Sequence, residues 1–378
     1  MLGLPMVSYE SGIGMSMLML ILSWFFMVLG ALTIVEICYN YPDGTNFKLI
    51  ANDCLGKIGQ AITWCAYILL VYSLLSAYMM GGASIISSLL ALEHVNIPNW
   101  LALAVFLAIL TPFVYCGTKS VDRLNRILLS SKLLFLIIVV SFILGSGNVS
   151  YNKIFDSKGL AIALPVLATS YTFHYIIPTI KSYLDIPKKQ LYKVVIIASL
   201  IPLTIYILWE IAIMGGFPGN GTNSFADVAA HGNNVGVFLV ELSHYVHNNF
   251  FSIILSIFYN IAITTSFLGT AISLLHFNEN TYNLKDNKFI SYLLTFMAPF
   301  LVVALFPNIF LQLLSYAGVF VAVLFLIIPG VMYLKKFYNN PEQRQSVFMV
   351  ASILLILTGI TILSCKAMSL ESSIAHLL

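Results

Sequence analysis

Ten stretches of mostly apolar residues, most of them long enough to cross a bilayer, divide this sequence. A helix that spans the hydrocarbon core needs about 20 such residues. Because lipid offers no hydrogen-bond partner to the backbone, a stretch of this kind must form a helix or part of a closed barrel. The pattern predicts an all-α integral membrane protein. The stretches are 14–40, 59–91, 100–115, 124–146, 159–184, 191–216, 250–276, 290–306, 308–333 and 346–364.

The composition agrees with lipid as the main solvent of the chain. Only 9% of the 378 residues are charged and the mean hydropathy is +0.94, whereas soluble domains carry about 25% charged residues. A net charge of +3 gives no argument for a nucleic-acid partner. The five cysteines lack metal-ligand or redox spacing and are interpreted as small apolar residues. We therefore expect no metal and no cofactor.

The basic residues set the orientation, because Lys and Arg are retained on the cytoplasmic side of a membrane. If the loop after 14–40 is inside, only three of the 18 basic residues fall outside, namely Lys153, Lys158 and Lys366. One membrane span more or fewer would destroy this asymmetry, because it would move every later loop to the other side. The expected cytoplasmic loops are 41–58, 116–123, 185–190, 277–289 and 334–345.

The first eight residues, MLGLPMVS, form a short apolar piece ahead of a helix that this orientation starts on the outside. At about 1.5 Å per residue the piece covers half a bilayer. We expect it to lie in the outer half of the membrane, and the inner half of the first helix to be missing from the chain as given.

The segment 159–184 carries Pro165 and Pro178 on either side of a polar centre at 169–174. Proline removes a backbone donor and clashes one turn back, so we expect this helix to break. The first residues share its pattern, since Pro5 and Pro178 each stand fifth in an apolar half-helix, MLGLP and HYIIP. Paired broken helices indicate a transporter with inverted repeats and a midplane substrate site. The alternative is a proline kink without a site.

Eight stretches, in order along essentially the whole chain, resemble one family. The chain is similar to the hydroxy- and aromatic-amino-acid permeases, and within them to the bacterial tyrosine-specific permeases. The stretches are MLGLPMVS, LTIVEICYNYP, YSLLSAYMMGGASIISS, VDRLNRILLSSKLLFLIIVV, SYTFHYIIPTIKSYLD, IPLTIYILWEIA, ITTSFLGTAISLLHF and LSYAGVFVAVLFLIIP.

The resemblance implies a LeuT-type fold with two inverted five-helix repeats plus one helix: repeat one 1–146, repeat two 159–333 and an extra helix 346–364. It implies a proton symporter in the bacterial cytoplasmic membrane that imports an aromatic amino acid, tyrosine first. Sodium coupling or tryptophan specificity are the alternatives. The family's Gly-x-Gly break before Met-Leu is absent from this chain, and the resemblance has Gln where Glu210 stands.

Residues at the two expected breaks are candidates to bind substrate. His174 offers a hydrogen bond or a proton relay, and its alternative role is to bond freed backbone carbonyls. Tyr78 is a candidate wall for the substrate ring, whereas Gly81 and Gly82 on the same face favour helix contact. The full set of substrate candidates is Met1, Leu2, Gly3, Tyr78, Ser170, Tyr171, Thr172, Phe173 and His174.

Lys132 lies inside the apolar run LLSSKLLFLIIVV, and an intramembrane Lys is a functional hypothesis by default. The resemblance places it on the fifth helix, facing the eighth, where Thr264, Thr265 and Ser266 offer hydroxyls. A protonated Lys132 is the expected coupling group, with snorkelling to the interface as the alternative. The three hydroxyls can instead coordinate Na⁺ or bond their own helix. Glu36 either pairs with basic residues of the inner side or takes part in proton passage.

Two other classes fit less well. A membrane enzyme needs converging carboxylates or a nucleophile with its base, and a channel needs a filter or a ring of charge; the sequence shows neither pattern. We expect no enzyme, no nucleic-acid partner and no obligatory protein partner, only an aromatic amino-acid substrate and membrane lipid. A few pocket contacts separate tyrosine from tryptophan or phenylalanine, so the sequence leaves that choice open.

Overall fold

The computed structural model of the chain describes residues 1–43, 45, 47–92, 94–145, 160–284, 286–306, 308–338 and 345–375, and all regular structure among them is helical. Each of the ten predicted segments corresponds to a helix or to consecutive helical pieces. By length and composition, eight of the described helices can cross a membrane. Seven of them are α2 (Ile13–Cys38), α3 (Phe47–Leu92), α5 (Thr118–Gly145), α8 (Lys188–Gly216), α11 (Asn249–Thr281), α12 (Lys288–Leu305) and α15 (Ser346–Ala375), and the eighth runs over Phe310–Phe337. α4 (Asn99–Tyr115) is a shorter apolar helix.

The predicted break in 159–184 is confirmed. An α-helix, α6, ends at Thr169, a 3-10 turn, η2, covers His174–Ile176, and α7 runs over Ile177–Leu184. Residue 159 lies outside the described residues. Another interruption was not predicted: a π-helical turn, η3 (Val323–Ile327), separates α13 (Phe310–Ala322) from α14 (Ile328–Phe337). The remaining pieces are α1 (Leu4–Ser8), η1 (Tyr9–Ser11), α9 (Phe225–Ala230) and α10 (Val235–Val246).

The predicted loop boundaries were wrong in several places, because the helices continue past their apolar parts. α5 begins at Thr118, directly after Gly117 at φ +83°, so most of the predicted loop 116–123 is helical. α3 begins at Phe47 and is interrupted at Gly56, where φ is +76°. Hydropathy marks only the residues that lipid covers, whereas a helix continues in water until a residue such as glycine ends it. Lys153, Lys158, Lys285 and Arg344 lie outside the described residues.

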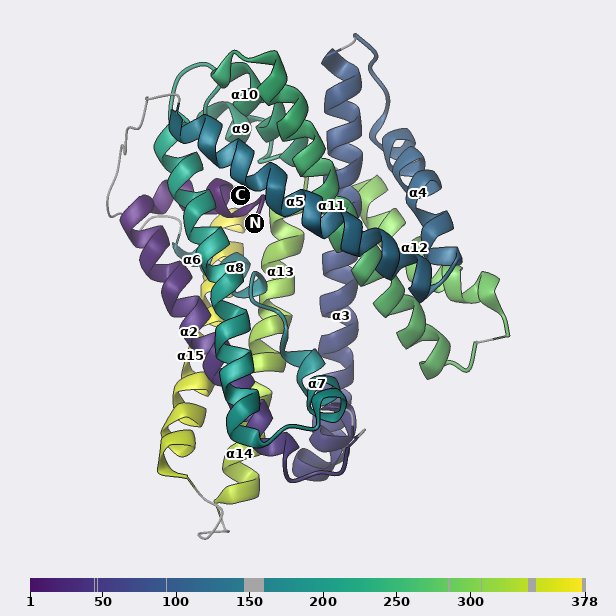
Figure 1. The fold of residues 1–378 in the computed structure, drawn as a ribbon, viewed down its shortest axis with the longest axis vertical. Coiled ribbons are helices and arrows are strands. Elements are labelled where there is room, and N and C mark those ends of the chain that lie inside the picture. Colours follow the sequence, from purple (N-terminus) through teal and green to yellow (C-terminus); the bar gives the residue numbers. More distant parts are fainter. Residues whose placement is uncertain are drawn as a thin grey trace. The chain divides into compact units, whose positions relative to one another are not determined.

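The chain forms two compact units, each built from three stretches. Unit 1 consists of Met1–Ile13, Val71–Ile154 and Leu208–Leu314, and unit 2 of Gly14–Leu70, Phe155–Ile207 and Ser315–Leu378. In unit 1, α5 packs against α11, and α4 and α12 also contact α11 (Figure 1). In unit 2, α15 packs against α6, η3 and α14.

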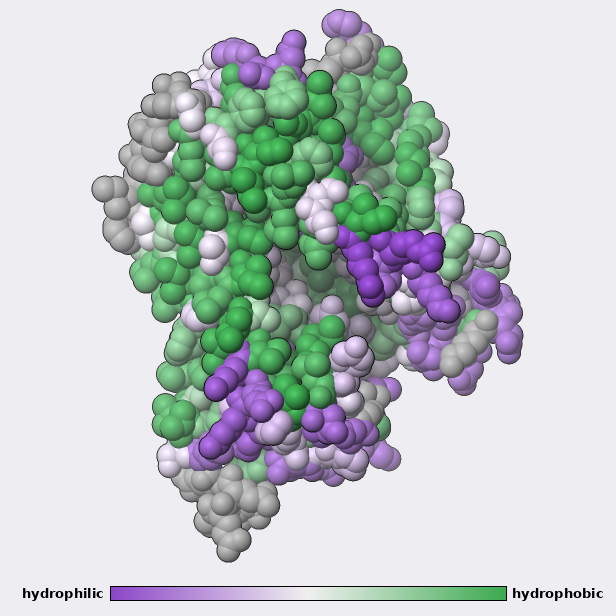
Figure 2. Space-filling view, in the orientation of Figure 1, coloured by the Kyte–Doolittle hydropathy of each residue, from purple (hydrophilic) through white to green (hydrophobic). Residues whose placement is uncertain are grey.

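The outward faces of the long helices are apolar. Ile137 on α5 and Ile197 on α8 are each 64% exposed, and Leu357 on α15 is 56% exposed. Figure 2 shows one face of the molecule with broad hydrophobic areas over the helices and hydrophilic residues gathered elsewhere. A soluble protein rarely exposes so much contiguous apolar surface. These faces suit lipid, as the sequence predicted.

Candidate functional site

The break in unit 2 lies between α6 and η2, at residues 170–173. α7 begins with Pro178 in its first turn, where a missing N–H costs nothing and the fixed φ suits a helix. Two hydrogen bonds hold the break in place. The Tyr206 hydroxyl donates to the Ser170 carbonyl oxygen at 3.1 Å, and the Thr172 hydroxyl donates to the Thr169 carbonyl oxygen at 3.1 Å. The break is therefore an ordered turn, not a frayed helix end.

Tyr171 and His174 both attach the break to α2. Tyr171 is 1% exposed, and its hydroxyl donates to the Leu20 carbonyl oxygen at 3.4 Å. His174 is fully buried, and its Nε2 lies 2.7 Å from the Met27 carbonyl oxygen. Since a carbonyl only accepts, Nε2 carries the proton of this hydrogen bond. His174 thus bonds a backbone carbonyl of α2, and its Nδ1 has no partner among the described residues.

The π-helical turn η3 supplies the other wall around His174. The Phe325 ring stacks on the imidazole, with centroids 4.6 Å apart and planes 14° from parallel, while Phe173 covers it at 4.9 Å. On α2, Gly30 makes this approach possible, because a Cβ there would lie 2.3 Å from the Phe325 carbonyl oxygen. π-Helical turns are frequent at functional sites.

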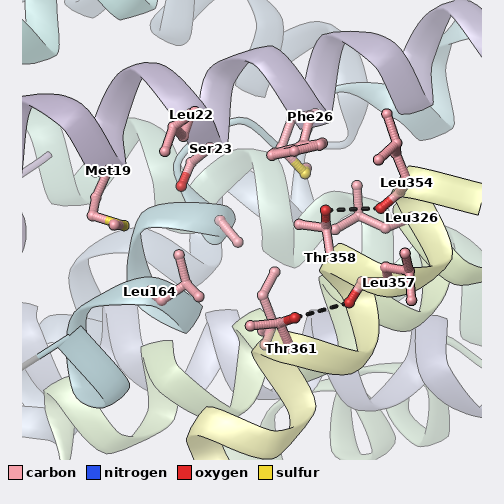
Figure 3. A pocket seen from close by; sticks show the side chains of 13 residues that line it. Met19, Leu22, Ser23, Phe26, Leu164, Leu326, Leu354, Leu357, Thr358 and Thr361 are labelled. Atoms are coloured by element: carbon pink, nitrogen blue, oxygen red, sulfur yellow. Dashed lines mark hydrogen bonds between the residues drawn. The ribbon is translucent and has the colours of Figure 1, made fainter. Parts of the chain in front are cut away.

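A cavity of about 290 Å³ opens beside this break in unit 2 (Figure 3). α2 contributes Met19, Leu22, Ser23 and Phe26 along one side, and α15 faces them with residues such as Leu357. The Thr358 and Thr361 hydroxyls in the wall donate to carbonyls of their own helix, at 2.8 and 2.9 Å. None of the predicted substrate residues lines it, and no charged group does. The cavity can hold an apolar group but offers no charged partner to the head of an amino acid.

The first residues of the chain form a second half-helix, in unit 1. α1 begins at Leu4 with Pro5 in its first turn, the same arrangement as in α7. Leu2 and Gly3 are buried, and a Cβ on Gly3 would meet the Leu311 side chain at 3.2 Å. After α1, the Tyr9 ring stacks on Phe225 with centroids 4.6 Å apart. The predicted substrate residues Met1, Leu2 and Gly3 therefore precede a half-helix that other parts of unit 1 hold in place.

Tyr78 and the two glycines lie on α3 in unit 1. A Cβ on Gly81 would lie 2.5 Å from Ile263 of α11, and one on Gly82 would lie 2.2 Å from Phe106 of α4. Both glycines therefore serve close helix contact. Tyr78 is half-buried on the same helix.

Lys132 lies half-buried on α5, the helix that packs against α11. It makes no hydrogen bond or ion pair among the described residues. On α11, the Thr265 and Ser266 hydroxyls donate to carbonyls one turn back, both reaching Ala262 at 3.1 and 3.0 Å. Thr264 is half-buried beside them. The hydroxyl oxygens can still accept a bond from a cation.

Glu210 on α8 is a buried carboxyl in unit 1 for which we predicted no role. It is 1% exposed, and neither carboxyl oxygen has a partner of normal hydrogen-bond geometry among the described residues. The Ser8 side chain of α1 is close enough to act on it.

Glu36 lies in unit 2 and is surrounded by partners. It is 3% exposed, and its carboxylate accepts bonds from Lys188 at 2.7 Å, from Gln345 at 3.3 Å and from the Tyr192 hydroxyl. This is the pairing with a basic residue that was one of the two predictions for Glu36.

Another polar cluster of unit 2, the Tyr41 cluster, consists of Tyr41 after α2, Asp53 and Cys54 of α3, and Lys336 of α14. The Tyr41 hydroxyl donates to Asp53 at 2.6 Å, and Lys336 stands 3.7 Å above the Tyr41 ring. Burial raises the pKa of the Tyr41 phenol, and the hydrogen bond to Asp53 raises this pKa further.

Sequence reasoning missed the partners of these groups. The basic pattern identified Lys188 as a cytoplasmic residue, but nothing in the sequence pointed from Glu36 to Tyr192 or Gln345. The π-helical turn had one faint signal, Pro329 just after it, since a proline disturbs the hydrogen bonds of the preceding turn. Glu210 could have been found, because an ionisable residue within an apolar span is by default a functional candidate.

Comparisons with known proteins bear on this architecture. The family described as tryptophan/tyrosine permease family matches residues 1–366. Glutamine transporter 2 of Aliivibrio fischeri is 30% identical over 347 residues, which cover 91% of this chain and 87% of that protein. The tryptophan-specific transport protein of Haemophilus influenzae is 30% identical over 349 residues, covering 88% and 83% of the two chains. Tyrosine-specific transport system 2 of the same organism is 27% identical over 376 residues, covering 96% and 91%.

A solved structure described as the inward facing conformation of Mhp1 has a TM-score of 0.57 with this chain. The match covers 98% of this chain and 88% of the Mhp1 chain, at 13% sequence identity. A likeness at this identity shows the fold alone, and it confirms the LeuT-type fold predicted from the sequence. By its match to the family over residues 1–366, this multi-pass membrane protein belongs to the tryptophan/tyrosine permease family and is an amino-acid permease, not an enzyme.

Proposed function

We propose that this permease imports an aromatic amino acid, tyrosine first, across the bacterial cytoplasmic membrane by proton symport. The observation that carries the proposal is the family match over residues 1–366, with relatives named as tyrosine- and tryptophan-specific transport proteins. Tryptophan is the second candidate substrate. Glutamine enters the test because a relative named as a glutamine transporter is as similar as the tryptophan-specific one.

The proposed substrate groups belong to the two half-helices and their units. α1 and α7 each begin with a proline in the first turn, as expected of two inverted repeats, which we assign to 1–146 and 159–333, followed by the extra helix 346–364. Within unit 1, the candidates are the backbone of Met1, Leu2 and Gly3 for the amino-acid head and the Tyr78 ring for the aromatic side chain. Within unit 2, the candidates are the break at 170–173 for the head and the Phe173 ring for apolar contact.

Lys132 supports the proton as coupling ion. It is a half-buried lysine on a helix that can span the membrane, and no anion among the described residues pairs with it. In the proposed cycle its ammonium bonds near Thr264–Ser266 in one state and loses its proton in the other. A fixed positive charge favours one conformation, so its loss allows the helices to rearrange.

Uptake into membrane vesicles tests both parts of the proposal. We expect labelled tyrosine to accumulate when an inward pH gradient is imposed, and to equilibrate without accumulation when the gradient is collapsed. Unlabelled tryptophan, phenylalanine and glutamine serve as competitors, with glutamine the weakest. Uptake that follows Na⁺ instead of pH contradicts proton symport, and uptake blocked best by glutamine contradicts an aromatic substrate.

The proposed orientation places the loop after α11 in the cytoplasm. A single cysteine at position 286, in a variant without the five native cysteines, should resist a membrane-impermeant thiol reagent in intact cells and react after permeabilisation. A cysteine at position 233, between α9 and α10, is the control and should react from outside. Ready labelling at 286 in intact cells would reverse the orientation.

A further inference from the structure

Unit 1 buries a carboxyl that the proposed function does not use. Glu210 is 1% exposed on α8, and neither of its oxygens has a partner of normal hydrogen-bond geometry among the described residues. A buried carboxylate is tolerated when a cation or several donors offset its lost hydration. Among the described residues no Lys, Arg or His forms an ion pair with Glu210.

Two other buried polar atoms of unit 1 lack a hydrogen-bond partner among the described residues. They are Nε1 of Trp209 on α8 and the hydroxyl of Tyr259 on α11, and the two ring centroids lie 6.4 Å apart. Unmatched buried polar groups are rare in native proteins, and each calls for an explanation.

α1 is an element of unit 1 that approaches Glu210, because the Ser8 side chain of α1 acts on the carboxyl.

We propose that Glu210 is a proton-binding site of the transport cycle, neutral in the state described here and ionised in another state. The proposal rests on the proposed symport function. A neutral carboxyl fits a buried place without a counter-charge, whereas the carboxylate needs water or a cation. In the cycle, the O–H bond of the carboxyl breaks when its surroundings open to the cytoplasm. The proton then goes to water, and the electron pair stays on the carboxylate until a proton binds from the outer side.

Infrared difference spectroscopy on the purified protein tests the protonation state directly. The parent at pH 7 should show the C=O stretch of a protonated carboxyl that changes when tyrosine is added. Glu210→Gln keeps the shape of the side chain but cannot titrate, so it should lack this band. Glu241→Gln is the matched control, because Glu241 is a half-exposed carboxylate on α10 of the same unit, and it should keep the band. A band that persists in Glu210→Gln overturns the proposal.

Flux measurements in proteoliposomes test the place of this proton in the cycle. Glu210→Gln should move one proton fewer per substrate than the parent while still exchanging substrate across the membrane. Glu210→Asp, which can titrate, should keep the parent ratio. An unchanged ratio in Glu210→Gln overturns the coupling role. If the parent itself accumulates substrate with Na⁺ and not with protons, the proposed symport fails, whereas the infrared band still reports on Glu210 separately.

Discussion

The two units treat buried charge in opposite ways. In unit 2, Glu36 is 3% exposed and is bonded by Lys188, Tyr192 and Gln345. The Nζ of Lys366, also buried, lies 4.3 Å from the centre of the Tyr316 ring. In unit 1, Glu210 is as deeply buried and has no ion pair among the described residues, and the half-buried Lys132 has none either.

This difference separates buried charges that stabilise the fold from ionisable groups that can change their protonation state or their partners. The partners of a buried ion replace its lost hydration. Removing one partner therefore leaves the other charge buried with the full free-energy cost of its desolvation. A buried ion without partners costs stability in that state and has to gain a proton, a water or a counter-ion elsewhere in a cycle. We therefore expect substitutions in unit 1 to affect coupling and those in unit 2 to affect stability.

Lys132→Ala should have the largest effect, on function. If its charge is the coupling group, accumulation of tyrosine under a pH gradient should fall by more than about tenfold, a loss above about 1.4 kcal/mol of coupling free energy. Substrate exchange without a gradient should remain. Vesicle uptake with and without the gradient measures both.

Two further variants complete that test. Lys132→Arg should stall turnover, because Arg stays protonated. Lys119→Ala, which removes an exposed lysine of the same helix, should accumulate tyrosine like the parent. Undiminished accumulation by Lys132→Ala would make Lys132 a snorkelling anchor and would remove half of the contrast between the units.

Glu36→Gln should have the largest effect on stability. Lys188, whose side chain is about a third exposed, would lose its counter-charge, and we expect a loss of about 3 kcal/mol, the lower end for breaking a buried pair. Thermal unfolding of the detergent-solubilised protein measures the shift. The double variant Glu36→Gln with Lys188→Met should lose less than the sum of the single variants, since the pair acts together.

The surface pair Arg126–Asp122 provides the control, because its side chains are 79% and 54% exposed. Asp122→Asn should change stability by less than about 0.5 kcal/mol. Equal losses of stability from Asp122→Asn and Glu36→Gln would show that the buried hydrogen bonds of Glu36 stabilise the protein no more than a surface ion pair does.

Gly30→Ala should have an intermediate effect within unit 2. The new methyl would stand 2.3 Å from the Phe325 carbonyl oxygen, so α2 and η3 must separate, at a cost of about 2 kcal/mol for overpacking. Gly269→Ala on α11 is a matched helical control, since no atom lies within 4 Å of the position of its new Cβ. A stable Gly30→Ala protein would mean that the contact between α2 and the π-helical turn is loose.

Apart from the controls, the Tyr41 cluster should give the smallest effect. Lys336→Met removes a cation above Tyr41 and an ion pair with Asp53, which is 67% exposed, so the loss should be below about 1 kcal/mol. The folded protein raises the pKa of Tyr41. The phenol therefore contributes fully to the free energy of unfolding below about pH 10, the pKa of tyrosine in the unfolded chain, and this contribution falls as the pH rises above that value. Thermal unfolding between pH 8 and pH 11 should show that fall reduced in Tyr41→Phe.

Much of the fold followed from local sequence. Apolar length located the ten segments, and the prolines at 165 and 178 located the break, because both effects act within a few residues of chain. Helix ends were predicted less well. α5 starts at Thr118 because Gly117 adopts a left-handed conformation there, which hydropathy does not register. The π-helical turn escaped prediction because a change of backbone hydrogen bonding inside an apolar run leaves the composition unchanged.

The sequence by itself determined that this chain crosses a membrane many times, that one helix is broken and that few ionisable groups lie within the spans. Each of these depends on transfer free energy or on proline geometry, which neighbouring residues fix. Only the tertiary structure decided which of those groups have partners: Glu36 meets Lys188 and Gln345 from far along the chain, His174 meets the Met27 carbonyl oxygen, and Glu210 meets no such group among the described residues. The physical reason is that hydrogen bonds and ion pairs act over a few ångströms, and only packing brings distant segments that close.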